Sequence, residues 1–428
     1  MYDHTLDKLP SRALLVAVQL PGIEDGALAE SLGELRRLAK TLGLEVVGEY
    51  TQRRSRFEPA TYVGKGKVAE LKLLIEGESA DTLLVDHEIT PSQARNLQKE
   101  TGAKEVLDRT AVIIEIFHRH ARSRAAKAQV EIVRLEYMAP RLREQGEKKD
   151  RGRGSGVGRG TGESQMELDR RKLRDRIAEL HAELAALAEE RSTQRARRSE
   201  LNRVALVGYT NAGKSTLMRA LTGSDVYIAD KLFATLDTTV RTLEPPTVPK
   251  ILVSDTVGFI KQLPHGLVDS FKSTLDEALE ASLLVHVVDA SDPGFMGQHF
   301  VTEEVLSEIG AGAVPRLLVL NKIDRGGDEA ALQARFPDAL VLSARRPDDV
   351  ARLYAAIVEF FAKDLVEAEL FVAWTRQQLR GEIFAECRVL EERHDEDGTT
   401  FRLRAPGPVL DRLRVAAAGG GLPVAVDR

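Results

Sequence analysis

Cysteine is nearly absent from this sequence of 428 residues, which contains only Cys387. A single thiol cannot form an internal disulfide, so we expect a reducing compartment. Aromatic residues are also scarce, at 5%, but hydrophobic residues make up 43% of the chain, enough for the two to four domains expected at this length. No apolar run approaches the roughly 20 residues of a membrane-spanning helix. These absences exclude a disulfide-rich secreted domain and an integral membrane protein.

The N-terminal segment 1–20 does not follow the pattern of a signal peptide. Acidic residues precede its short apolar stretch, and no small-residue cleavage site follows. Charged residues make up 30% of the chain, a level typical of soluble proteins. We therefore expect a cytoplasmic protein, with partial association with a membrane left open.

Positive charge is concentrated in the middle of a chain whose net charge is −5. Residues 119–203 contain 22 Lys and Arg against 14 Asp and Glu, so this segment is basic and the remainder is acidic. A basic segment on an acidic protein indicates localised contact with a polyanion. A solvated helical surface is the alternative interpretation.

Strands alternate with helices in two separate parts of the chain. Residues 1–108 are predicted to form an α/β domain with a mostly parallel sheet, in which Pro91 and Gly102 stand where one helix should begin and end. Residues 201–363 repeat this alternation, which again predicts a mainly parallel sheet. The last segment, 364–428, has a strand-like FAECRVLEE, a DEDG turn and a strand-like TFRLRAP, which indicates a small α+β domain.

The segment between these parts, 109–200, is predicted to be helical. A basic, glycine-rich stretch at 145–163 cannot form a packed element and should be mobile. A second helix is expected from about Ser164 to Ser199, with apolar residues spaced by three, four and seven. Two helices with a basic tip indicate an antiparallel hairpin, and two helices packed elsewhere are the alternative. The apolar positions are Met166, Leu173, Ile177, Leu180, Leu184 and Leu187.

A phosphate-binding pattern, GxxxxGKS, lies between an apolar strand and a helix. A loop in this context turns backbone N–H groups towards phosphate oxygens, and the following helix adds its positive N-terminal end. We expect Lys214 to reach the β- and γ-phosphates as a catalytic side chain and the Ser215 hydroxyl to bind Mg²⁺. The predicted phosphate-binding residues are Gly208, Tyr209, Thr210, Asn211, Ala212, Gly213, Lys214, Ser215 and Thr216.

Three further motifs follow in the order that a GTPase requires. Asp255 ends an apolar strand and can hold the Mg²⁺ site through water, while the Gly258 N–H can contact the γ-phosphate. Asp324 can accept both the N1–H and the amino group of guanine, a donor pair that adenine lacks. Backbone N–H groups of an SAR motif can reach the guanine O6. The predicted residues are Asp255, Thr256, Val257 and Gly258, then Asn321, Lys322, Ile323 and Asp324, and finally Ser343, Ala344 and Arg345.

The four motifs together predict a P-loop GTPase domain, and four unrelated turns are the alternative. The segment KLFATLDTTVRTLEPP lies where its first switch is expected. Thr235, Thr238 and Thr239 all compete there as a Mg²⁺ ligand. Phe259 occupies the position where Ras-like enzymes have a glutamine that orients the attacking water. Because phenylalanine has no hydrogen-bonding group, we expect slow hydrolysis in isolation. The alternative is that Phe259 only packs against the switch, which would leave hydrolysis equally slow.

Longer strings extend beyond these motifs. FATLD, DTVGFI, LPHGLV, TLDEAL and NKID lie in the GTPase part, and YVGKGKVAEL, DHEITPSQARNL, DRTAVIIEIFHRHARS, KAQVEIVRLEYMAPRL and GESQMELDRRKLRDRI lie upstream. Over roughly residues 12–362 the chain thereby resembles the HflX-type GTPases of the translation-factor-related class. The resemblance implies that FATLD is the first switch and that Thr235 is its Mg²⁺ ligand. We expect Thr235, Gly258 and Phe259 to be catalytic residues together with Lys214. The implied switch residues are Phe233, Ala234, Thr235, Leu236 and Asp237.

The resemblance implies an enzyme that hydrolyses GTP to GDP while bound to the large ribosomal subunit and its RNA, and that splits or rescues stalled ribosomes. We expect a monomer. Mg²⁺ is the implied cofactor. In related GTPases an asparagine at the position of Asn211 holds K⁺, although asparagine is also a good turn residue. The basic segment fits contact with ribosomal RNA. The chain departs from the family at REQGEKKDRGRGSGVGRGTGE, which lacks the usual aromatic residue and proline.

Two other functions are compatible with the sequence. A regulatory switch for a protein or membrane partner would not need the basic hairpin. An ATP-dependent RNA-remodelling enzyme, regulated by its GTPase domain, would need a second nucleotide site. The VGKGK loop at 63–67 could bind phosphate or form a simple turn. We expect His118 and His120 at the surface or facing RNA.

Overall fold

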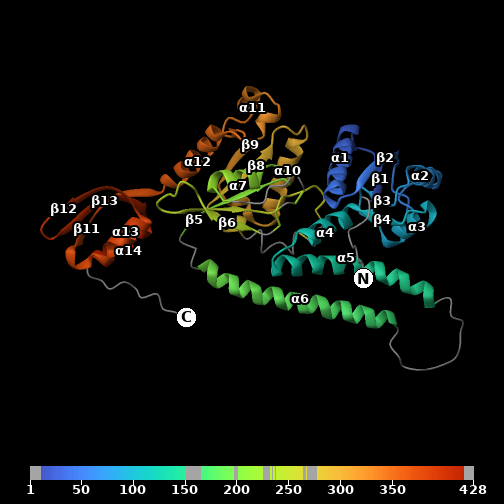
Figure 1. The fold of residues 1–428 in the computed structure, drawn as a ribbon, viewed down its shortest axis with the longest axis horizontal. Helices are drawn as coiled ribbons and strands as arrows, with labels where there is room; N and C mark the ends of the chain where they lie inside the picture. The colour runs from blue at the N-terminus through green and yellow to red at the C-terminus, as the bar shows by residue number, and fades with distance from the viewer. Residues whose placement is uncertain are drawn as a thin grey trace. The chain divides into compact units, whose positions relative to one another are not determined.

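The chain divides into two compact units, seen in the computed structural model in Figure 1. The first contains residues 1–193, 229–237 and 257–274, and the second contains residues 194–228, 238–256 and 275–428. The structure describes residues 11–150, 165–196, 201–224, 232–233, 235–236, 238–263, 267 and 277–418, with only the backbone at 142–150, 165–167 and 190–196.

A parallel four-stranded sheet in the order β2-β1-β3-β4 forms a core of the first unit. Its strands are β1 (Arg12–Gln19), β2 (Glu45–Arg53), β3 (Thr82–Val85) and β4 (Glu105–Asp108). The two central strands are almost wholly buried and pair in register from Ala13 opposite Thr82 to Val16 opposite Val85. Burial on both faces is typical of parallel sheets. The predicted α/β class is therefore confirmed.

Helices α1 (Asp25–Leu42), α2 (Lys65–Glu78), α3 (Pro91–Thr101) and α4 (Arg109–His120) accompany these strands. The start and end of α3 are as predicted. Thr90 caps its first turn, Pro91 occupies the first helical position, and Gly102 ends it in a left-handed conformation. Helix α4 begins where the Asp108 side chain accepts the N–H of Ala111 at 2.8 Å.

Two long helices, α5 (Arg124–Asp150) and α6 (Gln165–Ala196), lie side by side and antiparallel in Figure 1. A small apolar cluster joins them, in which Ala128, Ile132 and Leu180 are buried. Arg124 on α5 also forms an ion pair with Glu183 on α6. Leu180 belongs to the predicted apolar seam, so this contact uses the helix face that the spacing predicted.

Helix α5 is longer than predicted. The sequence predicts a non-helical stretch from residue 145, but α5 continues to Asp150. Glutamate and lysine at 147–149 are good helix formers, which lets the helix pass Gly146 before the glycine-rich run begins. Residues 151–163 of the predicted basic tip lie outside the described residues. Among the helices that the structure describes, none is long and apolar enough to cross a membrane.

A six-stranded sheet in the order β10-β9-β8-β5-β7-β6 lies in the second unit. Its strands are β5 (Asn202–Gly208), β6 (Thr239–Thr242), β7 (Ile251–Asp255), β8 (Leu283–Asp289), β9 (Arg316–Asn321) and β10 (Leu340–Val341). Only β6 pairs antiparallel with its neighbour, so the sheet is mainly parallel, as predicted. Its helices are α7 (Lys214–Thr222), α10 (Phe295–Glu308), α11 (Glu329–Arg335) and α12 (Pro347–Ala362), with short 3-10 turns η1 (Ala311–Ala313) and η2 (Ile323–Arg325).

An antiparallel sheet in the order β11-β13-β12 follows in the same unit. Its elements are β11 (Leu365–Ala373), η3 (Trp374–Arg376), α13 (Gln378–Glu386), β12 (Arg388–His394), β13 (Gly398–Pro406) and α14 (Gly407–Ala418). The predicted strand FAECRVLEE is wrong in its first three residues, which end α13. Leu379 and Ile383, one turn apart, bury one face of this helix, and the strand begins only at Arg388. The division of the chain into four domains stays a prediction.

Candidate guanine-nucleotide site

The loop between β5 and α7 is shaped by two glycines with positive φ. Gly208 has a φ of 145°, and a Cβ there would lie 2.1 Å from the carbonyl oxygen of Val287. Gly213 has a φ of 102°, and its Cβ would lie 2.3 Å from Asn321 Nδ2. Only glycine fits at either position, because the backbone closely approaches strands β8 and β9. The two glycines of GxxxxGKS are therefore required by packing as well as by phosphate binding.

Lys214 begins helix α7 and is buried, with 6% of its surface exposed. Its Nζ donates to the carbonyl oxygens of Gly208 and Tyr209, at 3.0 and 2.9 Å. Burial lowers the pKa of Lys214 to about 8, although the charge of Asp255 opposes this shift. An ammonium group held in a buried position at the start of a helix favours an anion in front of the loop.

Two oxygen atoms suited to Mg²⁺ lie beside each other at the end of β7. Ser215 Oγ donates to Asp255 Oδ2 at 2.7 Å, and Asp255 is completely buried. Thr256 fixes the following turn by donating from Oγ1 to the carbonyl oxygen of Leu206 at 2.8 Å. Hydroxyl and carboxylate oxygens are the hard ligands that Mg²⁺ prefers, so the residues present fit this ion.

Asn321, at the end of β9, ties the predicted guanine-binding segment to the phosphate loop. Its Nδ2 donates to the Ala212 carbonyl oxygen and its Oδ1 accepts the Ala344 N–H, both at 2.9 Å. Lys322 Nζ donates to the Asn211 carbonyl oxygen at 2.6 Å. Three motifs that lie far apart in the sequence are thus joined by buried or half-buried hydrogen bonds.

Asn211 has a left-handed backbone, with a φ of 60°. Asparagine tolerates this conformation better than most residues do. The shape of the loop therefore gives asparagine a structural reason to be there. That Asn211 binds K⁺ stays a prediction.

Asp324 lies in η2 with its carboxylate fixed at both oxygens. Oδ1 accepts the Ser343 hydroxyl at 2.6 Å, and Arg345 Nη1 lies 3.9 Å from Oδ2. The hydrogen bond from Ser343, then a backbone hydrogen bond and the charges of Arg345 and Arg325, hold the pKa of Asp324 below its ordinary value. The carboxylate is therefore an ionised acceptor at neutral pH, as contact with guanine N1–H and its amino group requires.

Two carboxylates of this network were not identified from the sequence. Asp289, the last residue of β8, accepts from Lys322 Nζ at 2.7 Å. Asp349 on α12 accepts the Ser343 N–H at 2.9 Å. Asp289 follows the apolar run LLVHVV as Asp255 follows ILVS, so the same strand-end signal could have identified it. Asp349 sits in the first turn of a helix, where acidic residues are common, and its partner depends on the tertiary fold.

The predicted first switch belongs to the first compact unit. Phe233 is buried and has a positive φ of 55°, and its ring centroid lies 4.5 Å from that of Phe117 on α4. The Phe233 carbonyl oxygen lies 2.8 Å from His120 Nδ1, and the Leu232 N–H donates to Thr41 Oγ1 at 3.3 Å. The segment is thus bound to helices α1 and α4 through its backbone and one aromatic ring.

His120 differs from its expected place at the surface or facing RNA. It is half-buried and bonded to the switch backbone, because it follows Phe117 by nearly one turn of α4. His118 is exposed.

The other predicted switch residues are placed as follows. Leu236, Val257, Gly258 and Phe259 are buried, Thr235 is half-buried, and Ala234 and Asp237 lie outside the described residues. Burial of Phe259 fits the packing role. The catalytic roles of Phe259, Thr235 and Gly258 stay predictions.

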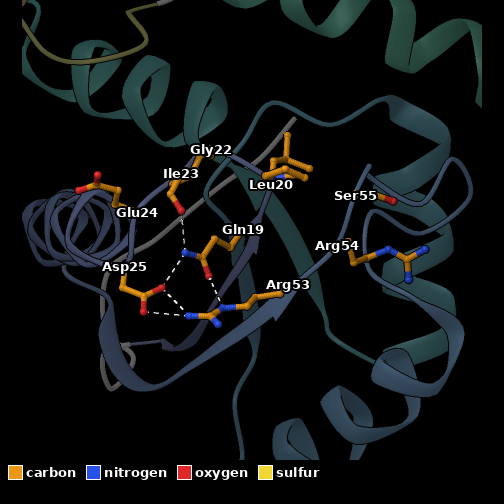
Figure 2. A pocket seen from close by; sticks show the side chains of 10 residues that line it. Gln19, Leu20, Gly22, Ile23, Glu24, Asp25, Arg53, Arg54 and Ser55 are labelled. Carbon is orange, nitrogen blue, oxygen red and sulfur yellow. Dashed lines mark hydrogen bonds and ion pairs between the residues drawn. The ribbon is translucent and has the colours of Figure 1, made fainter.

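A hollow of about 660 Å³ lies where β1 and β2 end in the first unit, and three of its polar side chains, Gln19, Asp25 and Arg53, pair with one another (Figure 2). Gln19 Nε2 and Arg53 Nη2 both donate to Asp25 Oδ1, at 2.8 and 2.6 Å. In the VGKGK loop, the Gly64 N–H at the start of α2 donates to Gln52 Oε1 at 3.0 Å. The Gly64 contact favours the simple turn among the two interpretations of that loop.

Comparison with known proteins extends over nearly the whole chain. Residues 29–118, 120–198 and 203–322 match the families described as GTP-binding GTPase N-terminal, GTP-binding GTPase Middle Region and 50S ribosome-binding GTPase. Among solved structures, a GTP-binding protein from the archaeon Sulfolobus solfataricus in complex with GDP is 25% identical, with a TM-score of 0.46, over 81% of this chain and 99% of that one.

Two relatives named GTPase HflX have higher identity. The relative from Gluconacetobacter diazotrophicus is 51% identical over 95% of this chain and 98% of its own length. That of Escherichia coli is 37% identical over 392 residues, which cover 90% and 92%. These likenesses confirm the predicted enzyme class, a GTP hydrolase, and the predicted resemblance. The chain belongs to the HflX family of GTPases.

Proposed function

We propose that this GTPase acts on the large ribosomal subunit and that binding to the subunit accelerates its GTP hydrolysis. The observation that carries the proposal is the match of residues 203–322 to the 50S ribosome-binding GTPase family. The site geometry alone supports a guanine nucleotide but does not specify the partner. The basic segment 119–203 independently supports a polyanionic partner such as ribosomal RNA.

Lys214 is the proposed phosphate contact of the site. Its ammonium group, bonded to the Gly208 and Tyr209 carbonyl oxygens, would exchange these neutral acceptors for anionic phosphate oxygens. The backbone N–H groups of Gly213 and Ser215 precede and begin α7, where the helix end favours negative charge. Phosphoryl transfer depends on positioning and charge, and this loop supplies both.

Ser215, Thr235 and Asp255 are the proposed holders of Mg²⁺, with Asp255 acting through water. When bound, the ion neutralises charge that develops on the transferred phosphoryl group. The hydrogen bond between Ser215 and Asp255 keeps their oxygens together before any ion arrives. We extend the proposal to K⁺ at Asn211, where it would supply positive charge as an arginine finger does.

Asp324 selects guanine in this proposal. Its ionised carboxylate can accept the N1–H and the amino group of the base, while the Ser343 hydroxyl holds the carboxylate in place. Adenine would leave the carboxylate without that pair of donors, which is a large penalty in a site built for them.

Phe259 is the residue that makes a partner necessary. It stands where a water-orienting glutamine is expected and is buried, so its ring has no means of positioning water. The ribosomal subunit would order the second switch or position the missing group. The finer role that we propose is the splitting or rescue of stalled ribosomes by a monomer whose hairpin, 109–200, contacts ribosomal RNA.

Co-sedimentation with purified subunits tests the partner. The chain should pellet with large subunits, and more strongly with a non-hydrolysable GTP analogue than with GDP. Lys214→Ala should lose this nucleotide dependence. Equal pelleting with small and large subunits in every nucleotide state would overturn the proposal. Gradient sedimentation of intact ribosomes, with the chain and GTP added, tests splitting separately.

A further inference from the structure

Two histidines and a glutamate gather between β8 and α10, outside the hydrogen-bonded network of the nucleotide site but near it. One donor atom from each of His286, His299 and Glu303 lies within 4.8 Å of the other two. His286 is 1% exposed, whereas His299 and Glu303 are half-buried. The cluster is thus closed by the sheet on one side and reachable from the surface of α10 on the other.

The sequence spacing brings these side chains together. Successive residues of a strand point to opposite faces of the sheet, and Val285 and Val287 belong to the core that contains α7 and α12. His286 between them therefore faces the other side, where its contact with α10 is made. His299 and Glu303 are four residues apart and share one face of that helix.

The contacts of the cluster leave two nitrogen atoms unused. His286 Nδ1 lies 3.0 Å from Glu303 Oε1, and the two imidazole rings stack with centroids 4.8 Å apart. His286 Nε2 and His299 Nδ1 are buried and have no hydrogen-bond partner among the described residues. A buried polar atom without a partner is costly, so a ligand that takes the lone pair of His299 Nδ1 would remove one of these two costs.

We propose that His286, His299 and Glu303 bind a divalent transition-metal ion, and that Zn²⁺ fits best. Two imidazoles and one carboxylate, with water in a fourth position, form a common protein donor set for zinc. Zinc bonds of about 2.0–2.1 Å place tetrahedral donors roughly 3.3 Å apart. Donor atoms now within 4.8 Å would need to approach by at most roughly 1.5 Å, a movement that the half-buried His299 permits.

A cation of the neighbouring strand holds the carboxylate of the cluster. Arg316 on β9 pairs with Glu303 Oε2, while Oε1 faces His286. Arg316 would therefore orient the ligand carboxylate, as outer contacts of metal sites do. Its positive charge limits the affinity.

Bound Zn²⁺ would tie α10 to β8 next to the nucleotide site. Strand β8 ends at Asp289, whose carboxylate holds Lys322 in the NKID segment. The ion would thus stabilise the second unit without touching the nucleotide, and it does not depend on the ribosomal role proposed above.

The test is zinc binding by the full chain. Protein stripped with a chelator is dialysed against Zn²⁺ with excess Mg²⁺ and GDP, which together occupy the nucleotide site, and bound zinc is measured by elemental analysis. We expect one equivalent with a Kd of roughly 10 μM or below. His299→Ala and Glu303→Gln should each weaken binding at least tenfold while GTP binding continues, which shows that the fold survives.

Matched controls are His181→Ala and Glu304→Gln, exposed residues on α6 and α10 that should keep the full equivalent. Titration with Co²⁺ should give visible absorption bands of a four-coordinate site, and these should disappear in His299→Ala. Absence of stoichiometric zinc, or an equivalent that both ligand variants retain unchanged, would overturn the proposal. The cluster would then be only a polar tie between β8, β9 and α10.

Discussion

Asp324 is the residue on which base selection depends. In Asp324→Asn an amide replaces one acceptor by a donor, while the contact with the Ser343 hydroxyl can persist. Preference should move from guanine towards xanthine nucleotides, with GTP affinity falling about 100-fold or more, because buried polar groups of the base are left mismatched. Competition binding with GTP, XTP and ATP measures this, with the exposed Asp338→Asn as control. Unchanged preference for GTP would show that Asp324 does not contact the base.

Lys214 gives the site a pH dependence. Its pKa is about 8 in the buried loop, and phosphate charge should raise this value on binding, so binding above pH 8 takes up a proton. GTP affinity should therefore hold below pH 8 and fall as pH rises through 8 to 9, approaching about tenfold per pH unit. Calorimetry in two buffers of different ionisation enthalpy measures the proton uptake. Absence of uptake at pH 8.5 would mean that Lys214 is already fully protonated or does not reach the phosphates.

At the scale of elements, one aromatic contact helps to hold the predicted first switch against α4. Phe233→Ala removes the ring that packs on Phe117 of α4, and loss of a buried phenylalanine costs about 3–5 kcal/mol. We expect a fall of that order in the free energy of unfolding of the first unit, measured by denaturant titration. Leu73→Ala on α2 of the same unit, whose side chain is 69% exposed, should change it by about 0.5 kcal/mol or less. A similar small effect for Phe233→Ala would show that the switch is not bound to α4.

The strands of the nucleotide site could be predicted because each ends in a motif. Apolar runs end at Gly208, Asp255 and Asn321, and the carboxyl ends of parallel strands meet at one edge of a sheet. The order of these motifs therefore predicted which segments come together. The observed bonds from Asn321 to Ala212 and from Ser215 to Asp255 follow from that arrangement.

The rest could not be predicted, because it depends on contacts between segments without a shared motif. The burial of Phe233 requires α4, and the bond between Asp349 and Ser343 requires the docking of α12. The end of α13 was missed because strand-like residues such as Phe384 also suit a helix whose opposite face is buried. Local pattern specifies the element, and tertiary packing decides where it ends.

The tip of the hairpin carries a prediction about charge. Reversal of Lys148, Lys149, Arg151 and Arg153 to glutamate should weaken binding to ribosomal subunits and leave GTP affinity unchanged. If all four residues contact phosphates, these contacts alone should lower the affinity of the wild type for the subunit roughly 100-fold between 50 and 200 mM salt. The affinity of the variant should fall less. Subunit binding at a series of salt concentrations measures the slope.

A matched variant controls for net charge. It reverses four exposed lysines outside the hairpin, namely Lys40, Lys65, Lys72 and Lys99. If this variant and the tip variant weaken binding equally, the effect is general electrostatics and the tip is a solvated linker.

At the scale of the whole molecule, a nucleotide site and a basic helical hairpin lie in one chain. A nucleotide can change ribosome affinity only by favouring one of two conformations, so GTP-dependent binding requires different affinities of the two states for the subunit. The anchoring of Phe233 to α4 gives the first switch a physical link to the unit that contains the hairpin.

Single-turnover GTP hydrolysis, with and without large ribosomal subunits, tests the central claim most directly. With Phe259 in place of a water-orienting glutamine, the chain alone should be slow, near the ~10⁻⁴ to 10⁻³ s⁻¹ of unassisted small GTPases. Large subunits should accelerate it at least about tenfold by ordering the site. K⁺ should stimulate where Na⁺ does not, and Asn211→Ala should remove that difference. A fast basal rate that subunits leave unchanged would contradict the account.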